Sequence, residues 1–359
     1  MPAEDRRLLE TVIAGVPALH SHVWIATSGS TGMLKLVALS MEAILASAAA
    51  VNLHLAAQSE DRWCLTLPAF HVGGLGIHAR AWLGGNDVVE LEEWNAPVFA
   101  RLCDREKLSL SALVPAHVSD LVRGGIRAPG CVRGIVVGGG ALDEAQYAQA
   151  RRLGWNLLPS YGMTECASQA ATATLSSLRE SAYPELRLLA HLDARAEPDG
   201  RIALKGPSLL SGYAWWENGR AVFLDPRVDG WFTSEDIGEV LAGDEGKTLT
   251  VRGRRGEMIK VGGELVSLAR LDAILTSILR EYPNSDAAIV AVPDTRLGAV
   301  IHAAVCGLAS DEIVARYNDR VLPFERARTV HRVNRIPRTE LEKLQRSELL
   351  RMVGGSSEE

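Results

Sequence analysis

A loop rich in glycine and hydroxyl residues follows the first strand-like run of the sequence, which begins at Val23. Its residues are Thr27, Ser28, Gly29, Ser30, Thr31, Gly32, Met33, Leu34 and Lys35. Exposed backbone N–H groups and hydroxyl donors of this kind suit a chain of phosphates. The spacing differs from the G-x-x-x-x-G-K P-loop and from the G-x-G-x-x-G pattern. The loop is a candidate phosphate site of another type, and a flexible turn without a ligand is the alternative.

A second candidate site combines an aromatic ring, a glycine, a hydroxyl and a carboxylate in consecutive residues. These are Tyr161, Gly162, Met163, Thr164 and Glu165. A tyrosine ring can stack on a base, a glycine lets a ligand approach the backbone, and a carboxylate can bind a hard cation through oxygen. Taken alone, the segment is more often a turn that ends in a solvated glutamate.

Two further segments offer surfaces for the remaining parts of a nucleotide. A flat ring could lie on the bare backbone that follows a buried strand, at Gly138, Gly139, Gly140, Ala141 and Leu142. The alternative for this segment is a helix start capped by Asp143. Asp236 lies among apolar residues in the segment 229–238, where a carboxylate could bind both hydroxyls of a ribose.

Two basic segments lie in the last third of the chain. The first, 253–264, contains Arg254, Lys260, Gly262 and Gly263, and the second, 336–346, contains Lys343. Lysine is scarce in this chain, so its presence in both segments is mildly informative. A charge-rich tail is nonetheless usually a solvated face.

The elements around these segments alternate between strand and helix. Apolar runs at 63–67, 88–91, 111–114 and 134–137 predict strands, and the patterns at 40–57, 97–107, 116–123 and 143–153 predict helices. Such alternation predicts a mostly parallel sheet with helices on both faces. From about 187 to 251 short strands predominate, and after Arg254 a small α+β unit follows. We therefore expect a large α/β domain at 1–255 and a smaller domain at 256–359.

Composition excludes several classes of protein. The chain has 359 residues, 47% of them hydrophobic and 23% charged, which is typical of a globular protein of two or more domains. A net charge of -6 gives no electrostatic reason to expect nucleic acid, and no apolar run is long enough to span a membrane. The five cysteines never form a C-x-x-C pair, which argues against a disulfide framework and a zinc site. We expect a cytoplasmic enzyme.

Taken together and in this order, the segments resemble the adenylate-forming superfamily of acyl-CoA ligases, luciferases and nonribosomal adenylation domains. The resemblance runs from Ile25 to Leu349. Within the superfamily, the segments YGMTECASQ (161–169) and PAFHVGGL (68–75) look closest to the o-succinylbenzoate–CoA ligases of menaquinone biosynthesis. The resemblance implies that MgATP and a carboxylic acid form an acyl-adenylate and pyrophosphate, after which coenzyme A displaces AMP. Small molecules are the implied partners, and a homodimer is left open.

The resemblance also implies a role for each segment. Residues 27–32, with Lys35, would hold the β- and γ-phosphates, Thr164 the α-phosphate and Glu165 Mg²⁺. The adenine would lie between Tyr161, with Gly162 and Met163 beside it, and the backbone of residues 139–141; Asp236 and Arg254 would bind the ribose. Lys343 would bridge the acid and the α-phosphate. His71 would line the acyl pocket and gate it, and the alternative for His71 is a core histidine hydrogen-bonded in a turn. Lys260, Gly262 and Gly263 would line the thiol tunnel after the small domain swings about a hinge near Gly256.

Some positions depart from the family pattern. Leu34 replaces a usual proline, Ser234 and Glu235 replace Thr-Gly, Gly256 replaces a frequent Asp or Lys at the hinge, and Glu342 replaces the glycine before Lys343. Family members usually carry a long region before the phosphate loop, which here begins at Thr27, so we expect the large domain to lack a subdomain. Two alternatives to the favoured ligase therefore stay open. One is a ligase for another acid, or an adenylase that loads a carrier protein. The other is a non-catalytic nucleotide-binding relic.

Overall fold

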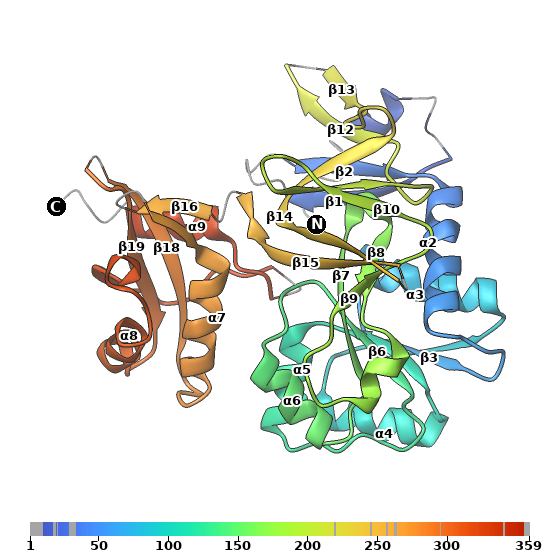
Figure 1. Cartoon of the computed structure of the whole chain (residues 1–359), viewed down its shortest axis with the longest axis horizontal. Helices are drawn as coiled ribbons and strands as arrows, with labels where there is room; N and C mark the ends of the chain where they lie inside the picture. Colours follow the sequence, from blue (N-terminus) through green and yellow to red (C-terminus); the bar gives the residue numbers. More distant parts are fainter. Residues whose placement is uncertain are drawn as a thin grey trace. The chain divides into compact units, whose positions relative to one another are not determined.

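The computed structural model describes residues 10–16, 19, 21–28, 34–218, 220–244, 246–255, 258–261, 264–294, 296–339 and 342–354 (Figure 1). The chain divides into two compact units. Unit 1 comprises Met1–Ser234 and Glu239–Thr250, and unit 2 comprises Glu235–Gly238 and Val251–Glu359. The domain limits expected from the sequence, with a boundary between 255 and 256, stay a prediction.

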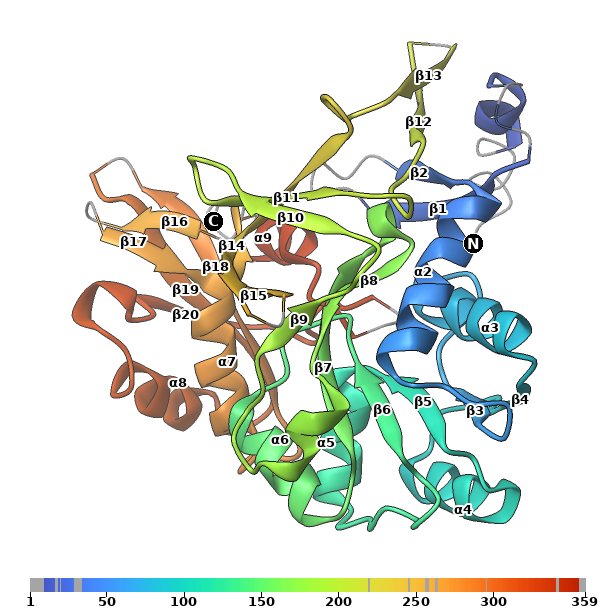
Figure 2. The ribbon, with the colours of Figure 1, turned by 45° about the vertical axis from the view of Figure 1, so that its right-hand side comes forward.

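The centre of unit 1 is a run of parallel strands in the order β4-β3-β5-β6-β7 (Figure 2). Helices follow these strands along the chain, as the alternating sequence pattern predicts. The strands are β3 (Arg62–Leu65), β4 (Asp87–Glu90), β5 (Leu110–Leu113), β6 (Gly134–Val137) and β7 (Leu157–Met163). The helices are α2 (Met41–His54), α3 (Val72–Gly84), α4 (Ala96–Glu106), α5 (Pro115–Arg123) and α6 (Glu144–Arg152).

Successive side chains of these strands point to opposite faces of the sheet, and on each face they form a core with a different set of helices. On β6, Ile135 and Val137 belong to the core that contains residues of α4, α5 and α6. Val136 belongs to the core that contains residues of α2 and α3. The predicted α/β arrangement is confirmed for this part of the chain.

Beyond β7 the same sheet continues with antiparallel neighbours, so the complete sheet of eleven strands is mixed. The β-rich segment predicted for 187–251 supplies most of this extension. The strands of the whole extension are β8 (Ser168–Thr172), β9 (Leu186–Leu188), β10 (Asp193–Ala196), β11 (Arg201–Lys205), β14 (Trp231–Gly243) and β15 (Gly246–Arg254).

A second sheet of unit 1 is antiparallel, in the order β1-β2-β12-β13. Its strands are β1 (Val23–Ser28), β2 (Leu34–Leu39), β12 (Gly212–Glu217) and β13 (Arg220–Leu224). The sequence interpretation has no strand between the phosphate loop and the helix at 40–57, so it misses β2. That helix starts at Met41 because the Ser40 hydroxyl accepts a hydrogen bond from Ala43 N (3.1 Å).

Unit 2 contains a three-stranded sheet in the order β18-β19-β20 and a short hairpin, β16-β17. Alternate residues of β18 again separate two cores: Ile289 packs with α7 and α8, whereas Val290 packs with Leu349 and Val353 of α9. The strands are β16 (Met258–Val261), β17 (Glu264–Ser267), β18 (Asp286–Asp294), β19 (Gly298–Cys306) and β20 (Thr329–Arg332). The helices are α7 (Leu268–Leu279), α8 (Ser310–Asn318) and α9 (Arg346–Gly354).

Two further observations bear on the predicted class of protein. All five cysteines are free thiols. In the part of the chain that the structure describes, no helix combines the length and the apolar character needed to cross a bilayer.

Candidate functional site

The segment predicted to bind adenine and metal lies where β7 ends and a short 3-10 helix, η2 (Thr164–Cys166), begins. Tyr161, Gly162 and Met163 are the last residues of β7, and Thr164 and Glu165 are the first of η2. Two hydrogen bonds hold Glu165 in place. Its backbone oxygen accepts from Leu210 N (2.8 Å), and its Oε1 accepts from the Tyr213 hydroxyl (2.8 Å). The Glu165 carboxylate is therefore oriented rather than freely solvated.

Gly162 is required by the neighbouring strand. A Cβ at this position would lie 1.8 Å from Ser168 O on β8, far inside van der Waals contact. The ladder between β7 and β8 is irregular between Tyr161 and Gly162. Ala167 (φ 58°) and Ser168 (φ 150°) adopt backbone conformations that non-glycine residues rarely take. The backbone is thus strained just after the turn that presents Thr164 and Glu165, and such strain clusters at functional sites.

The glycine segment after β6 has an exposed backbone. Gly139 has a positive φ of 82°, and a Cβ on Gly138 would meet nothing within 4 Å. Asp143 caps α6, since its Oδ1 accepts from Gln146 N (2.9 Å). The helix cap considered as an alternative is therefore present, and it leaves the backbone of Gly139, Gly140 and Ala141 exposed beside it.

Only the two ends of the predicted phosphate loop can be described. Thr27 on β1 pairs with Lys35 on β2, and its hydroxyl donates to Lys35 O (3.3 Å). Gly29, Ser30, Thr31, Gly32 and the side chain of Ser28 lie outside the described residues. Lys35 Nζ lies 5.9 Å from the centre of the Tyr213 ring, and Tyr213 binds Glu165. One tyrosine thus contacts both the lysine and the predicted metal ligand.

In unit 2 the structure brings together the two residues predicted to bind ribose. Arg254 Nε lies 3.7 Å from Asp236 Oδ1, on β15 and β14 respectively. Of the residues predicted for the thiol tunnel, Gly262, Gly263 and the side chain of Lys260 lie outside the described residues.

Lys343, also in unit 2, is exposed and lies between β20 and α9, in a small hairpin whose described residues are 338–339 and 342–344. Arg338 and Leu344 form an isolated antiparallel bridge. Within it, Thr339 N donates to Lys343 O (2.8 Å), and Lys343 N donates to the Thr339 hydroxyl (3.2 Å). Glu342 has a φ of 59°, in the left-handed region that favours glycine. This conformation explains why glycine is usual at that position in the resembling family.

His71, predicted to line the acyl pocket, is the residue before α3 and forms no side-chain cap. Its ring contacts that of Phe70, with 4.6 Å between the ring centres. Gly74, in the first turn of α3, cannot carry a Cβ, which would lie 2.3 Å from Pro68 O. The chain must therefore turn tightly where it presents His71.

A candidate functional residue that the sequence interpretation missed, Arg80, lies on the same helix. Its side chain is only 1% exposed, and it donates from Nη2 to the Ser168 hydroxyl (3.0 Å). Its Nε and Nη1 have no hydrogen-bond partner among the described residues. Burial lowers its pKa to about 10. A buried cation without an acid partner is costly, so such a residue indicates a ligand site. The sequence offers one sign of this role: Arg80 is a charged residue among the mostly apolar residues of the segment 72–84.

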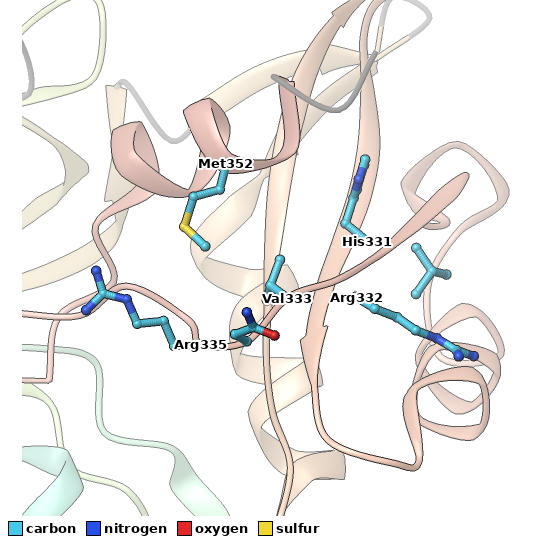
Figure 3. A pocket seen from close by; sticks show the side chains of 7 residues that line it. His331, Arg332, Val333, Arg335 and Met352 are labelled. Carbon is cyan, nitrogen blue, oxygen red and sulfur yellow. The ribbon is translucent and has the colours of Figure 1, made fainter. Parts of the chain in front are cut away.

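A surface pocket elsewhere in unit 2 contains none of the predicted site residues (Figure 3). It is lined by Val330, His331, Arg332, Val333, Asn334, Arg335 and Met352. Both arginines have acid partners: Arg332 lies 3.0 Å from Asp311, and Arg335 lies 3.3 Å from Glu348. His331 Nε2 lies 2.9 Å from His302 Nδ1. Because these charged side chains already have partners within the protein, the pocket lining does not indicate a ligand.

Comparisons with known proteins agree with the sequence interpretation. The pattern of the family described as AMP-binding enzyme matches residues 14–214. The 2-succinylbenzoate–CoA ligase of Bacillus licheniformis is 30% identical over 336 residues, which cover 90% of this chain and 68% of that protein. The resemblance to the adenylate-forming superfamily is thereby confirmed.

Solved structures of o-succinylbenzoate CoA synthetase from Bacillus subtilis share the fold. The complex with the acyl-adenylate intermediate OSB-AMP has a TM-score of 0.77 at 26% identity, covering 91% of this chain and 68% of that one. The complex with ATP and a magnesium ion has a TM-score of 0.76 at 25% identity, covering 91% and 69%. With a family match over more than half of its residues, the chain belongs to the AMP-binding enzyme family.

Proposed function

We propose that the chain is an AMP-forming acid–CoA ligase and that its acid is o-succinylbenzoate. In the first half-reaction, a carboxylate oxygen of the acid attacks the α-phosphorus of ATP, which forms the acyl-adenylate and releases pyrophosphate. In the second, the thiol of coenzyme A attacks the acyl carbon and AMP leaves. The family match, the ligase relatives and the fold shared with structures that hold ATP with magnesium or OSB-AMP support this reaction.

The residues of unit 1 suit the nucleotide and its metal. Mg²⁺ prefers carboxylate oxygen together with substrate phosphates. Tyr213 holds the Glu165 carboxylate through Oε1, so Glu165 would offer an oriented carboxylate to Mg²⁺, and the metal would supply charge neutralisation at the phosphates. Thr164 is adjacent and would donate to the α-phosphate. The exposed backbone at 139–141 and the Tyr161 ring would hold the adenine between them.

Asp236, Arg254 and Lys343 supply the remaining contacts to the adenylate. Asp236 binds the ribose hydroxyls, with Arg254 beside it. Lys343 donates to the acid and the α-phosphate, where negative charge accumulates in the transition state. In the second half-reaction, Lys260, Gly262 and Gly263 line the path of the thiol. These roles are part of the proposal.

Arg80 is the observation that carries the choice of acid. o-Succinylbenzoate keeps a second carboxylate after activation, and that group needs a donor in an apolar pocket. Arg80 is buried, has two nitrogens without a partner among the described residues, and lies on the helix that His71 begins. A guanidinium matches a carboxylate through two parallel hydrogen bonds. We assign Arg80 to the second carboxylate.

The test first measures pyrophosphate release from MgATP in the presence of o-succinylbenzoate. Coenzyme A is then added, and the thioester is detected by mass spectrometry. In Arg80→Gln we expect KM for the acid to rise about 10- to 100-fold, since a charged hydrogen bond contributes about 1.5–3 kcal/mol. KM for ATP should stay within about twofold by the same reasoning, because Arg80 has no role at the nucleotide. Arg101→Gln, at an exposed position of α4, is the matched control.

Each other outcome identifies one of the open alternatives. An unchanged KM for o-succinylbenzoate in a folded Arg80→Gln variant would remove Arg80 from the acid site. Pyrophosphate without thioester would indicate a carrier protein as the thiol acceptor, and a preference for a monocarboxylic acid would indicate another ligase. ATP binding without release of pyrophosphate from ATP in the presence of any acid would leave only the relic.

We also propose that the enzyme acts in the cytoplasm, where ATP and coenzyme A are available. The five free thiols support a reducing compartment.

A further inference from the structure

The hairpin that carries Lys343 is tied at both ends to one strand, β18. At its start, Arg338 donates to Asp286 through Nη2 to Oδ1 (2.8 Å) and Nε to Oδ2 (3.1 Å). At its end, Arg346 donates from Nη1 to Ile289 O (2.7 Å) and pairs with Asp272 of α7. Exposed Lys343 thus lies between two arginines that are anchored to the core of unit 2.

The contact between Arg338 and Asp286 has the geometry of a strong ion pair. Two parallel N–H···O bonds join the planar guanidinium to both carboxylate oxygens, an arrangement that fixes direction as well as distance. Burial opposes the charge of Arg338, but the hydrogen bonds and charge of Asp286 outweigh it and raise the pKa of Arg338. Asp286 is the first residue of β18, whose following residues are buried in both cores of the unit.

We propose that Asp286 is a positioning residue for adenylation, acting through Arg338 to hold the Lys343 hairpin in its working geometry. This inference rests on the proposed function, in which Lys343 serves the first half-reaction and not the second. Loss of the pair would leave unit 2 folded but let the hairpin move. A misplacement of about 1 Å costs on the order of 10²-fold in rate when a group must meet a transition state.

The test separates the two half-reactions in the full chain. Pyrophosphate release from MgATP and the acid reports the first, and thioester formation from synthetic acyl-adenylate with coenzyme A reports the second. For Asp286→Asn and Arg338→Lys, we expect kcat of the first to fall about 10- to 100-fold. Arg338→Lys keeps the charge but loses the planar fork, so it isolates the geometry. We expect the second half-reaction to stay within about twofold, because it does not use the hairpin.

Asp311→Asn is the matched control. It breaks another arginine–aspartate pair of unit 2, with Arg332 (3.0 Å), in which both side chains are exposed, and it should change neither half-reaction. Asp286→Glu, which keeps a carboxylate, should recover part of the lost rate.

The inference is overturned if Asp286→Asn and Arg338→Lys leave the first half-reaction within twofold, or if both variants lower the two half-reactions equally. The second result would mean that the pair only stabilises unit 2, which a lower unfolding temperature would accompany. Failure of the proposed function is a different result, since the unaltered chain would then release no pyrophosphate with any acid.

Discussion

The two regions proposed to serve the first half-reaction are positioned in opposite ways. The segment that ends in Glu165 directly continues strand β7 of the large sheet, and the backbone of β8 presses directly against Gly162. The described residues of the Lys343 hairpin lie outside the named strands, Lys343 itself is exposed, and the hairpin is held through arginine side chains. Backbone packing should therefore govern the first region, and charge the second. The difference suits the proposed reaction, in which the nucleotide-binding residues serve both half-reactions and Lys343 serves only the first.

Gly162→Ala should have the largest effect, and it tests the packed region. The new Cβ would lie 1.8 Å from Ser168 O, so β7 and β8 must separate. We expect the free energy of unfolding to fall by about 3 kcal/mol or more, and both half-reactions to be lost. Denaturant unfolding measures the first effect. Gly130→Ala, where a Cβ meets nothing within 4 Å, is the control. A fully stable Gly162→Ala variant would contradict the packing argument.

Tyr213→Phe removes one hydroxyl from the packed region without changing its shape. Without the bond to Glu165 Oε1, the carboxylate loses its orientation, and half-saturation by Mg²⁺ should require about 10-fold more metal. Pyrophosphate release and calorimetric binding of MgATP, each measured against Mg²⁺ concentration, report the change. Tyr147→Phe removes a buried hydroxyl that has no partner in the described part of the chain, and should leave the Mg²⁺ dependence unchanged.

Asp61→Asn tests an ion pair that stabilises unit 1 away from the site. Burial of Asp61 opposes its ionisation, but bonds from Arg133, Ser109 and Gln58 N outweigh it and lower its pKa. The pair therefore stabilises the fold above pH ~4, the ordinary value for aspartate, and this contribution is lost as the pH falls through the lower folded pKa. We expect a loss of about 1–3 kcal/mol at pH 7.

The pH dependence of that loss is the check. The difference in free energy of unfolding between the unaltered chain and Asp61→Asn should shrink as the pH is lowered from 5 towards 2.5. A difference that stays constant over this range would show that the charge of Asp61 is not the stabilising feature.

Glu342→Gly should have the smallest effect, and it sharpens the account of the hairpin. Glycine accepts the φ of 59° without strain, although it also loses more entropy on folding, so we expect a gain of no more than about 1 kcal/mol. Glu342→Gln keeps the strain but removes the charge beside Lys343. Thermal unfolding separates the two effects: only the glycine variant should be more stable. Equal stability of both variants would contradict a strained backbone at this position.

The parallel part of the sheet could be predicted from the sequence because its strands are short apolar runs separated by helical patterns. β2 could not, since the apolar run 34–39 lies directly before a helix and carries no sign of its partners β1 and β12. The continuation of the sheet into β8, β9 and β15 likewise depends on pairing between distant segments.

The site was predicted as a set of segments, not as a geometry. The order of the segments was enough to indicate the family, and the structure adds contacts that no local pattern contains. The bond from Tyr213 to Glu165 joins residues far apart in the chain, and the burial of Arg80 depends on Ser168 and on how α3 packs. Glu342 was recognised as a departure from the family, but its consequence required the backbone angle.

The most direct test of the account uses Lys343→Ala in both half-reactions. Pyrophosphate release with MgATP and o-succinylbenzoate should fall about 100-fold or more, as when one preorganised donor is removed from a transition state. The same variant, supplied with synthetic acyl-adenylate and coenzyme A, should form the thioester at the rate of the unaltered chain. Pyrophosphate release within a fewfold of the unaltered chain, or an equal loss of thioester formation, would contradict the division of labour between the two regions.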